Sequence, residues 1–233
     1  MSEQTRGAPK TIGVVGAGTM GAGIAQLACL AGARTLLHDP VPEALERGLE
    51  QIKGHLERGV TRGRLSQEDA AAALERLKAA PTLEELAPCE LVIEAAPERL
   101  ELKRDLFAGL SDGIVSEQCV LATNTSSLLV TAIASGAARP ERVVGMHFFN
   151  PAPLMRLLEV VAGAQSSVEA LSVARVAGEA MGKIVIEAVD GPGFLVNRCN
   201  RPFGLEGLRL LQERIATVAV SYTHLTLPTI LRV

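Results

Sequence analysis

The sequence lacks the features that mark several classes of protein. Its basic residues form no block and the formal net charge is −3, so a nucleic acid is not the expected partner. The four cysteines are widely spaced, without a CxxC pair or a histidine at zinc spacing, which predicts thiols in a reducing compartment and no metal site. No apolar stretch is long enough to span a membrane, and residues 1–10 contain no apolar segment like that of a signal peptide. These absences predict a soluble, cytoplasmic protein with neither a membrane nor a nucleic-acid partner.

Short β-branched runs alternate with helix-forming segments over roughly the first 190 residues. The predicted strands are Thr11–Val15, Arg34–Leu37, Leu91–Ile93, Cys119–Ala122, Val143–Met146, Leu157–Val161 and Ile184–Ile186. The predicted helices are Met20–Gly32, Pro42–Gly59, Ser66–Ala80, Pro97–Leu110 and Val168–Met181. This alternation predicts an α/β fold with a mainly parallel sheet covered by helices on both faces.

Residues 190–193 (DGPG) are the strongest break in the pattern and predict a domain boundary. Residues 1–189 would form the first domain, with a helical arm at about 42–80. Residues 190–218 would begin an all-α domain that is incomplete in this chain. Its first helix is expected over Phe194–Ile215, with leucines at helical spacing that need a partner surface. Pro202 should kink or restart this helix.

The last residues differ in composition from the rest of the chain. Residues 221–233 (SYTHLTLPTILRV) contain the only Tyr and a cluster of Thr, and the string resembles translated sequencing-adapter sequence. We therefore expect residues 219–233 to be a foreign tail fused to a truncated reading frame. The alternative is a Thr- and Leu-rich terminal strand.

A glycine-rich turn joins the first predicted strand to the first predicted helix. Gly16, Gly18 and Gly21 occupy the glycine positions of GxGxxG, with Thr19 and Met20 between them. Such glycines permit a tight turn, close approach of a pyrophosphate and close helix–strand packing, and the helix N-terminus attracts the phosphates. Strand–turn–helix is the context that this motif requires. The alternative is a glycine turn that serves packing alone.

Asp39 ends the second predicted strand, at the spacing of the acidic residue in dinucleotide-binding domains. Its carboxylate would accept hydrogen bonds from the ribose hydroxyls and repel a 2′-phosphate, which favours NAD over NADP. The alternative is that Asp39 initiates a turn before Pro40.

Further segments, in order, are VIEAAPE (92–98), NTSSL (124–128), GMHFFNP (145–151) and GPGFLVNR (191–198). Together with GVVGAGTMGAGIAQ (13–26), they closely resemble the L-3-hydroxyacyl-CoA dehydrogenase family over about residues 11–218. The resemblance implies a Rossmann-type, doubly wound domain with a helical arm, followed by a helical domain that builds a homodimer. It also implies NAD-dependent oxidation of the 3-hydroxyl of an acyl-CoA to a ketone.

The resemblance also implies roles for single residues. His147 matches the catalytic base, and Glu159 the carboxylate that orients it. Ser126 and Asn197 match the residues that hold the substrate oxygen. The matches on the nicotinamide side of NAD are Glu98, Lys103 and Asn124. On the helical arm that helps to hold CoA, the candidates are Lys53, Arg58, Arg62 and Arg64, since any of them could meet an anionic phosphate.

The chemistry of the residues agrees with these roles. Removing a hydroxyl proton as hydride leaves carbon needs a base near neutral pKa, and imidazole with a carboxylate on its second nitrogen meets that need. Taken singly, each residue has a plainer interpretation. His147 would be a core histidine, Ser126 a helix cap and Asn197 a polar helix residue, whereas the buried charge of Glu159 requires a partner.

Three other functions compete with this enzyme. The chain could be a catalytically incompetent NAD-binding fragment with a bare apolar helix, which its activity would decide. It could be a relative that oxidises a free 3-hydroxy acid, which a change of substrate would decide. A crystallin-like structural role has no feature in its favour.

Overall fold

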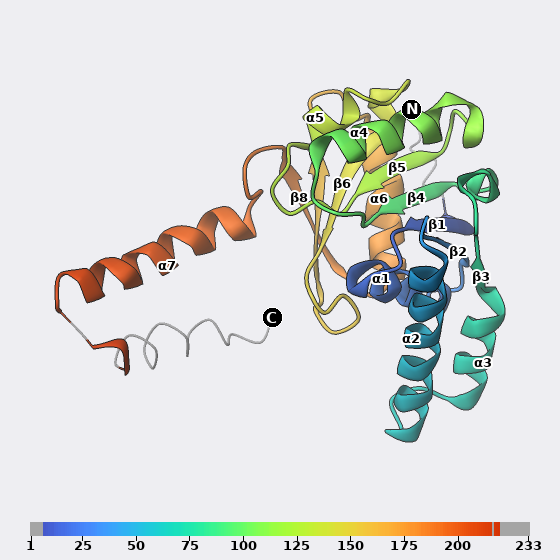
Figure 1. Cartoon of the computed structure of the whole chain (residues 1–233), viewed down its shortest axis with the longest axis horizontal. Helices are drawn as coiled ribbons and strands as arrows, with labels where there is room; N and C mark the ends of the chain where they lie inside the picture. Colours follow the sequence, from blue (N-terminus) through green and yellow to red (C-terminus); the bar gives the residue numbers. More distant parts are fainter. Residues whose placement is uncertain (1–6, 216, 220–233) are drawn as a thin grey trace.

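Eight strands form one sheet in the order β3-β2-β1-β4-β5-β6-β7-β8 (Figure 1). The computed structural model describes residues 7–215 and 217–219. The strands are β1 (Thr11–Val15), β2 (Arg34–His38), β3 (Leu77–Ala79), β4 (Leu91–Glu94), β5 (Val120–Thr123), β6 (Val143–Phe148), β7 (Leu157–Ala162) and β8 (Ile184–Val189). All neighbouring strands run parallel except β6 and β7, which are antiparallel. The prediction of a mainly parallel α/β sheet is confirmed.

Helices cover both faces of this sheet. They are α1 (Thr19–Leu30), α2 (Pro42–Thr61), α3 (Gln67–Arg76), α4 (Leu100–Gly109), α5 (Val130–Ala134), α6 (Val168–Ala180) and α7 (Val196–Gln212). One buried core contains side chains of α1, α2, α3 and α6, and the other contains side chains of α4 and α5. In β4, Leu91 and Ile93 belong to the first core and Val92 to the second. Successive side chains of the strand thus point to opposite faces, and both faces are buried.

Two elements differ from the sequence-based expectation. The helix predicted over Ser66–Ala80 ends at Arg76, and Leu77–Ala79 form β3 instead. This strand exists because β2 offers an edge, with Thr35 opposite Leu77 and Leu37 opposite Ala79. The short helix α5 was not predicted at all. Both elements depend on contacts far away in the sequence, which override local propensity.

The arm formed by α2 and α3 extends beyond the sheet (Figure 1). The turn between the two helices ends in a cap, because the Ser66 hydroxyl accepts a 3.0 Å hydrogen bond from the Asp69 backbone N–H. Ser66 also donates to the Asp69 carboxylate at 2.6 Å.

Helix α7 leaves the sheet after β8 and extends away from it (Figure 1). It continues through Pro202 as one helix, so of the kink or restart predicted at that residue, the restart does not occur. Leu205 and Leu208 are 63% and 62% exposed on it. Among the described residues, no helix has the length and apolar character needed to cross a bilayer.

Candidate active site

The turn between β1 and α1 needs glycine for three different reasons. Gly16 has φ +98°, and a Cβ there would lie 2.7 Å from the carbonyl oxygen of Ala95. A Cβ on Gly21 would lie 1.7 Å from the carbonyl oxygen of Gly16, so this glycine lets α1 start directly against the turn. A Cβ on Gly18 would meet nothing within 4 Å. Gly18 therefore faces open space at the N-terminus of α1, where a pyrophosphate could approach.

Asp39 follows β2 and lies next to this turn. Its Oδ2 accepts a hydrogen bond from the Ala17 N–H at 2.9 Å, and its Oδ1 accepts one from the Val41 N–H at 3.0 Å. Asp39 thus shapes the turn before Pro40, and its carboxylate keeps further acceptor capacity. A cleft of about 590 Å³ is lined by residues of the glycine turn, Thr19 and Met20 among them, and by Asp39. This geometry allows Asp39 both to initiate the turn at Pro40 and to accept hydrogen bonds from the ribose of a dinucleotide.

A second cleft, of about 460 Å³, lies where β4, β5 and β6 end. Met20 lines both clefts, so the two are adjacent. The second cleft collects predicted site residues from four separate parts of the chain: Glu98, Lys103, Asn124, Ser126, His147 and Asn197. The carboxyl ends of the parallel strands form this edge of the sheet, which is where ligands bind in doubly wound folds.

His147 lines this cleft and forms a buried pair with Glu159. The antiparallel register places them directly opposite each other on β6 and β7. The distance from His147 Nδ1 to Glu159 Oε2 is 2.6 Å, and the residues are 5% and 0% exposed. The rings of Phe149 and Phe194 lie against the imidazole, with centroids 4.5 Å and 5.6 Å away. The carboxylate on Nδ1 holds the tautomer whose Nε2 can accept a proton.

Ser126 and Asn197 meet at the mouth of the cleft. The side-chain amide of Asn197 donates to the backbone oxygen of Ser126 at 3.4 Å. Asn124 holds the base of the same loop, because its Oδ1 accepts a 2.9 Å hydrogen bond from the Phe148 N–H. The loop after β5 is thereby joined to the residue next to His147.

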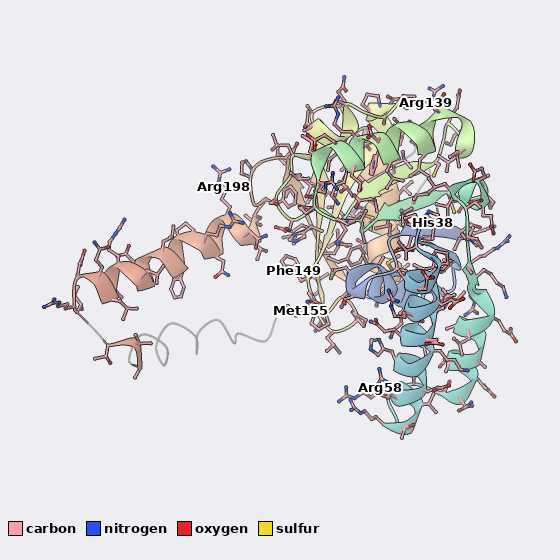
Figure 2. The ribbon with its side chains drawn as sticks, in the orientation of Figure 1. His38, Arg58, Arg139, Phe149, Met155 and Arg198 are labelled. Atoms are coloured by element: carbon pink, nitrogen blue, oxygen red, sulfur yellow. The ribbon has the colours of Figure 1, made fainter. Side chains whose placement is uncertain are left out.

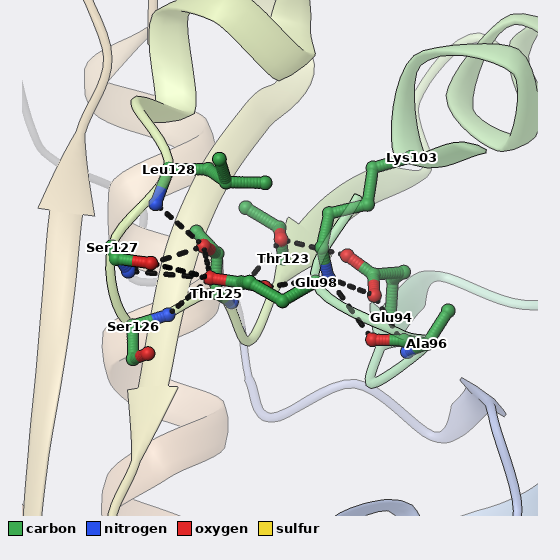
Figure 3. Close-up of polar contacts among 9 residues, drawn as sticks. All are labelled: Glu94, Ala96, Glu98, Lys103, Thr123, Thr125, Ser126, Ser127 and Leu128. Atoms are coloured by element: carbon green, nitrogen blue, oxygen red, sulfur yellow. Dashed lines mark hydrogen bonds and ion pairs between the residues drawn. The ribbon is translucent and has the colours of Figure 1, made fainter. Parts of the chain in front are cut away.

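A buried ion pair lies beside the loop that follows β5 (Figure 3). Lys103 Nζ is 2.5 Å from Glu94 Oε1, and the side chains are 1% and 0% exposed. Glu94 also accepts hydrogen bonds from the Ala96 N–H at 2.6 Å and the Thr123 hydroxyl at 2.7 Å. Each group of the pair has further polar partners, as a buried ion pair requires. Lys103 therefore acts within a closed network and presents little surface to a ligand.

Glu98 connects this network to the loop that carries Ser126 (Figure 3). Glu98 Oε2 lies 3.3 Å from Lys103 Nζ, and Oε1 accepts from the Ser126 N–H at 3.2 Å and from the Ser127 hydroxyl at 3.1 Å. It also accepts a hydrogen bond from the Thr125 hydroxyl. Partial burial raises the pKa of Glu98, but the Thr125 hydrogen bond and the Lys103 charge outweigh burial and hold the pKa below its ordinary value.

Comparison with known proteins identifies the family. Residues 11–191 match the family described as "3-hydroxyacyl-CoA dehydrogenase, NAD binding domain". The chain belongs to the 3-hydroxyacyl-CoA dehydrogenase family. A 3-hydroxyadipyl-CoA dehydrogenase of Escherichia coli is 44% identical over 211 residues, which are 91% of this chain and 44% of that protein. A probable 3-hydroxybutyryl-CoA dehydrogenase of Bacillus subtilis is 41% identical over 207 residues, 89% of this chain and 72% of that protein.

Solved structures give the same result. The (S)-3-hydroxybutyryl-CoA dehydrogenase of Ralstonia eutropha matches with a TM-score of 0.88 and 36% identity, over 91% of this chain and 75% of that one. A 3-hydroxybutyryl-CoA dehydrogenase of E. coli matches with a TM-score of 0.87 and 45% identity, over 89% of this chain and 44% of that one. The chain thus spans less than half of the length of its E. coli relatives. Its cofactor is NAD, and the open space at Gly18 and the acceptor at Asp39 fit that dinucleotide.

The chain has a basic groove of about 510 Å³ between the arm and the loop that follows His147. The groove is lined by Arg58, Arg62 and Arg64 on one side and by residues 151, 153 and 154 on the other. Arg58 lies on the side of α2 that faces this loop (Figure 2). Lys53, the other predicted arm residue, is exposed on α2 and is not among the residues that line the groove.

Two residues at this site were not predicted. Glu94 had a signal in the sequence, because a carboxylate ends the apolar run LVIE. Lys183 had none. It is 8% exposed, and its ammonium donates to the carbonyl oxygens of Ala152 at 2.5 Å and Met155 at 2.7 Å, which holds the loop after β6. Burial lowers the pKa of Lys183.

The histidines without a predicted role are His38, His55 and His224. His38 is buried, and its Nδ1 lies 2.8 Å from the Ala80 carbonyl oxygen. His55 lies on the arm, where burial and then the Arg58 charge lower its pKa. His224 lies outside the described residues. Within the described residues, no group of three or more His, Cys, Asp or Glu side chains could hold a metal ion.

Proposed function

We propose that this chain catalyses the reversible, NAD-dependent oxidation of an (S)-3-hydroxyacyl-CoA to the 3-oxoacyl-CoA. The observation that carries the proposal is the buried His147–Glu159 pair, 2.6 Å apart, whose histidine lines the cleft adjacent to the glycine turn. The relatives with more than 40% identity are named as dehydrogenases of 3-hydroxyacyl-CoA substrates, which supports the same reaction.

His147 is the base in the oxidation direction. Glu159 accepts from Nδ1, so Nε2 is left to take the proton of the substrate hydroxyl. The carboxylate then balances the positive charge of the imidazolium. When bound, NAD supplies the acceptor for the hydride from C3. In the reverse direction, protonated His147 is the acid that returns the proton to oxygen.

Ser126 and Asn197 are proposed to hold the substrate oxygen. Both line the cleft with His147, and both carry a hydrogen-bond donor. Donors placed at the oxygen stabilise the negative charge that grows on it as a ketone is reduced. Glu98 and its network then have a positioning task, because they hold the loop that carries Ser126.

The basic groove favours a CoA thioester over a free 3-hydroxy acid. Arg58, Arg62 and Arg64 give the groove the positive charge that CoA phosphates require, and a small hydroxy acid has no use for it. The site of hydride transfer and the groove both border the loop after β6, at Asn150 and Pro151 respectively. One ligand could therefore occupy both.

We further propose a cytoplasmic location and a helical second domain that builds a homodimer. The four thiols are free, which fits the reducing cytoplasm. The exposed leucines of α7 fit a helical domain that begins near residue 190 and builds a homodimer. Of the expected foreign tail, residues 220–233 lie outside the described residues.

The test is NADH oxidation by the purified chain with acetoacetyl-CoA, beside free acetoacetate. We expect turnover with the thioester and little with the free acid. Turnover with acetoacetate alone would contradict the CoA substrate. NADH binding without turnover of either compound would contradict the proposed activity and favour a fragment that only binds the cofactor.

A further inference from the structure

The first turn of α7 is held by a residue distant in the sequence. The first N–H groups of a helix have no partners within it, and the residue that precedes α7, Leu195, has no side chain able to accept a hydrogen bond. Glu159 supplies the acceptor instead. Its Oε1 accepts from the Leu195 N–H at 3.0 Å and from the Val196 N–H at 2.8 Å.

The two oxygens of Glu159 therefore serve different parts of the molecule. Oε2 accepts from His147 at the end of β6, and Oε1 accepts from the start of α7. The side chain is fully buried. Such charge-assisted hydrogen bonds are stronger than neutral ones, and a negative charge is favoured at a helix N-terminus.

The turn before α7 is shaped to reach this carboxylate. Phe194 has φ +45°, a left-handed conformation that is uncommon for residues other than glycine. Phe194 is 5% exposed, and its ring lies against the imidazole of His147. A bulky residue keeps such a conformation only where surrounding contacts hold it. The hydrogen bonds of the next two residues to Glu159 are contacts of that kind.

We propose that Glu159 is a positioning residue for Asn197 as well as for His147. Asn197 follows Val196 directly in the first turn of α7, so the carboxylate that fixes the helix start also fixes where the Asn197 amide points. Within the described part of the chain, the start of α7 is joined to the sheet and its loops by the hydrogen bonds to Glu159 and by the bond from the Asn197 amide to Ser126. The importance of His147 and Asn197 rests on the proposed function. The anchoring of α7 by Glu159 does not depend on turnover.

Hydrogen exchange of single backbone amides in this chain tests the anchor directly. The Leu195 and Val196 amides should exchange slowly in the wild type, although α7 is largely exposed. In Glu159→Ala they should exchange about tenfold to a hundredfold faster, since hydrogen bonds to a charged group are lost. In Glu159→Gln the increase should be severalfold, because a neutral amide oxygen is a weaker acceptor.

Two controls make the exchange result decisive. His147→Ala abolishes the base but leaves Glu159 in place, so protection of Leu195 and Val196 should persist. Slow exchange of the amides in β1 and α1 shows that a variant is folded. If Glu159→Ala does not fold, the exchange of the Leu195 and Val196 amides in Glu159→Gln tests the anchor instead. Unchanged exchange in the folded Glu159 variants, or equal loss in His147→Ala, would overturn the proposal.

A binding experiment separates positioning from simple stabilisation of the helix. The affinity for acetoacetyl-CoA is measured by calorimetry for Asn197→Ala in the wild-type and the Glu159→Ala background. We expect Asn197→Ala to weaken binding severalfold in the first background and to change it little in the second. Equal losses in both would contradict a positioning role. If the wild type does not bind acetoacetyl-CoA, the proposed substrate is wrong. The hydrogen-exchange data still test whether Glu159 anchors the start of α7.

Discussion

Gly18 shows how a single residue can serve a ligand without serving the fold. Gly16 and Gly21 are required by the protein itself, because side chains there would collide with backbone. A Cβ on Gly18 would meet nothing, so its lack of a side chain matters only when a pyrophosphate approaches. The sequence motif predicted all three glycines, but it could not tell which of them the fold requires and which the ligand requires.

Gly18→Ala should therefore impair cofactor binding and leave the fold intact. We expect the affinity for NADH, measured by fluorescence titration, to fall tenfold or more, with a melting temperature close to that of the wild type. Gly109→Ala is the matched control, because its Cβ also meets nothing and it lies outside both clefts. A large loss of thermal stability in Gly18→Ala would contradict this division of roles.

Glu98 should give the molecule a stability that depends on pH. Its pKa in the folded protein lies below the ordinary value of 4.5, so the ionised carboxylate stabilises the fold above that pH. The contribution is lost as pH falls through the folded pKa. The wild type should thus unfold at higher urea concentration than Glu98→Gln at neutral pH, and the difference should shrink below about pH 4.5. A difference that stayed constant down to the acid transition would argue against the lowered pKa.

At the scale of elements, local sequence patterns predicted the strands well, but they failed where pairing with a distant strand determines the structure. Leu77–Ala79 follow an Ala-rich helix and carry no strand signal, yet they pair with the edge of β2. The opposition of His147 and Glu159 depends on the antiparallel register of β6 and β7, which periodicity does not predict. The resemblance to the family predicted both residues as a catalytic pair. Neither approach predicted that the second oxygen of Glu159 holds the start of α7.

The arm gives a prediction at this scale, because α2 carries basic residues inside and outside the groove. Arg58→Glu should raise the KM for acetoacetyl-CoA severalfold with little change in kcat, since binding is weakened equally in the ground and transition states. Lys53→Glu makes the same change of charge on the same helix but outside the groove, and should have a smaller effect. Steady-state kinetics at low salt measures both. Equal effects would show that only the net charge of the arm matters.

At the scale of the whole molecule, the cysteines show which parts of the chain lie in the core and which are exposed to solvent. Cys29, Cys89 and Cys119 lie in the core, where burial raises their pKa to about 11, 12 and 12. Cys199 is exposed on α7. The spacing of the cysteines in the sequence predicted thiols without a metal site, but it could not tell which thiol is exposed.

A thiol count should therefore separate one fast cysteine from three slow ones. At mildly alkaline pH the folded chain should react rapidly at Cys199 alone, because the buried thiols are both inaccessible and un-ionised. Denaturant should release the other three. In Cys199→Ser the rapid phase should vanish, and a rapid phase that persists would mean that one of the core thiols is open to solvent.

The measurement that tests the central claim most directly is the rate of NADH oxidation with acetoacetyl-CoA for the wild type and His147→Ala, together with the NADH affinity of each. A general base and acid contributes about a hundredfold to ten-thousandfold to the rate. We predict a loss of kcat within that range for His147→Ala, with an NADH affinity close to that of the wild type. Turnover by His147→Ala at the wild-type rate would contradict the assignment of His147 as the base and, with it, the proposed mechanism.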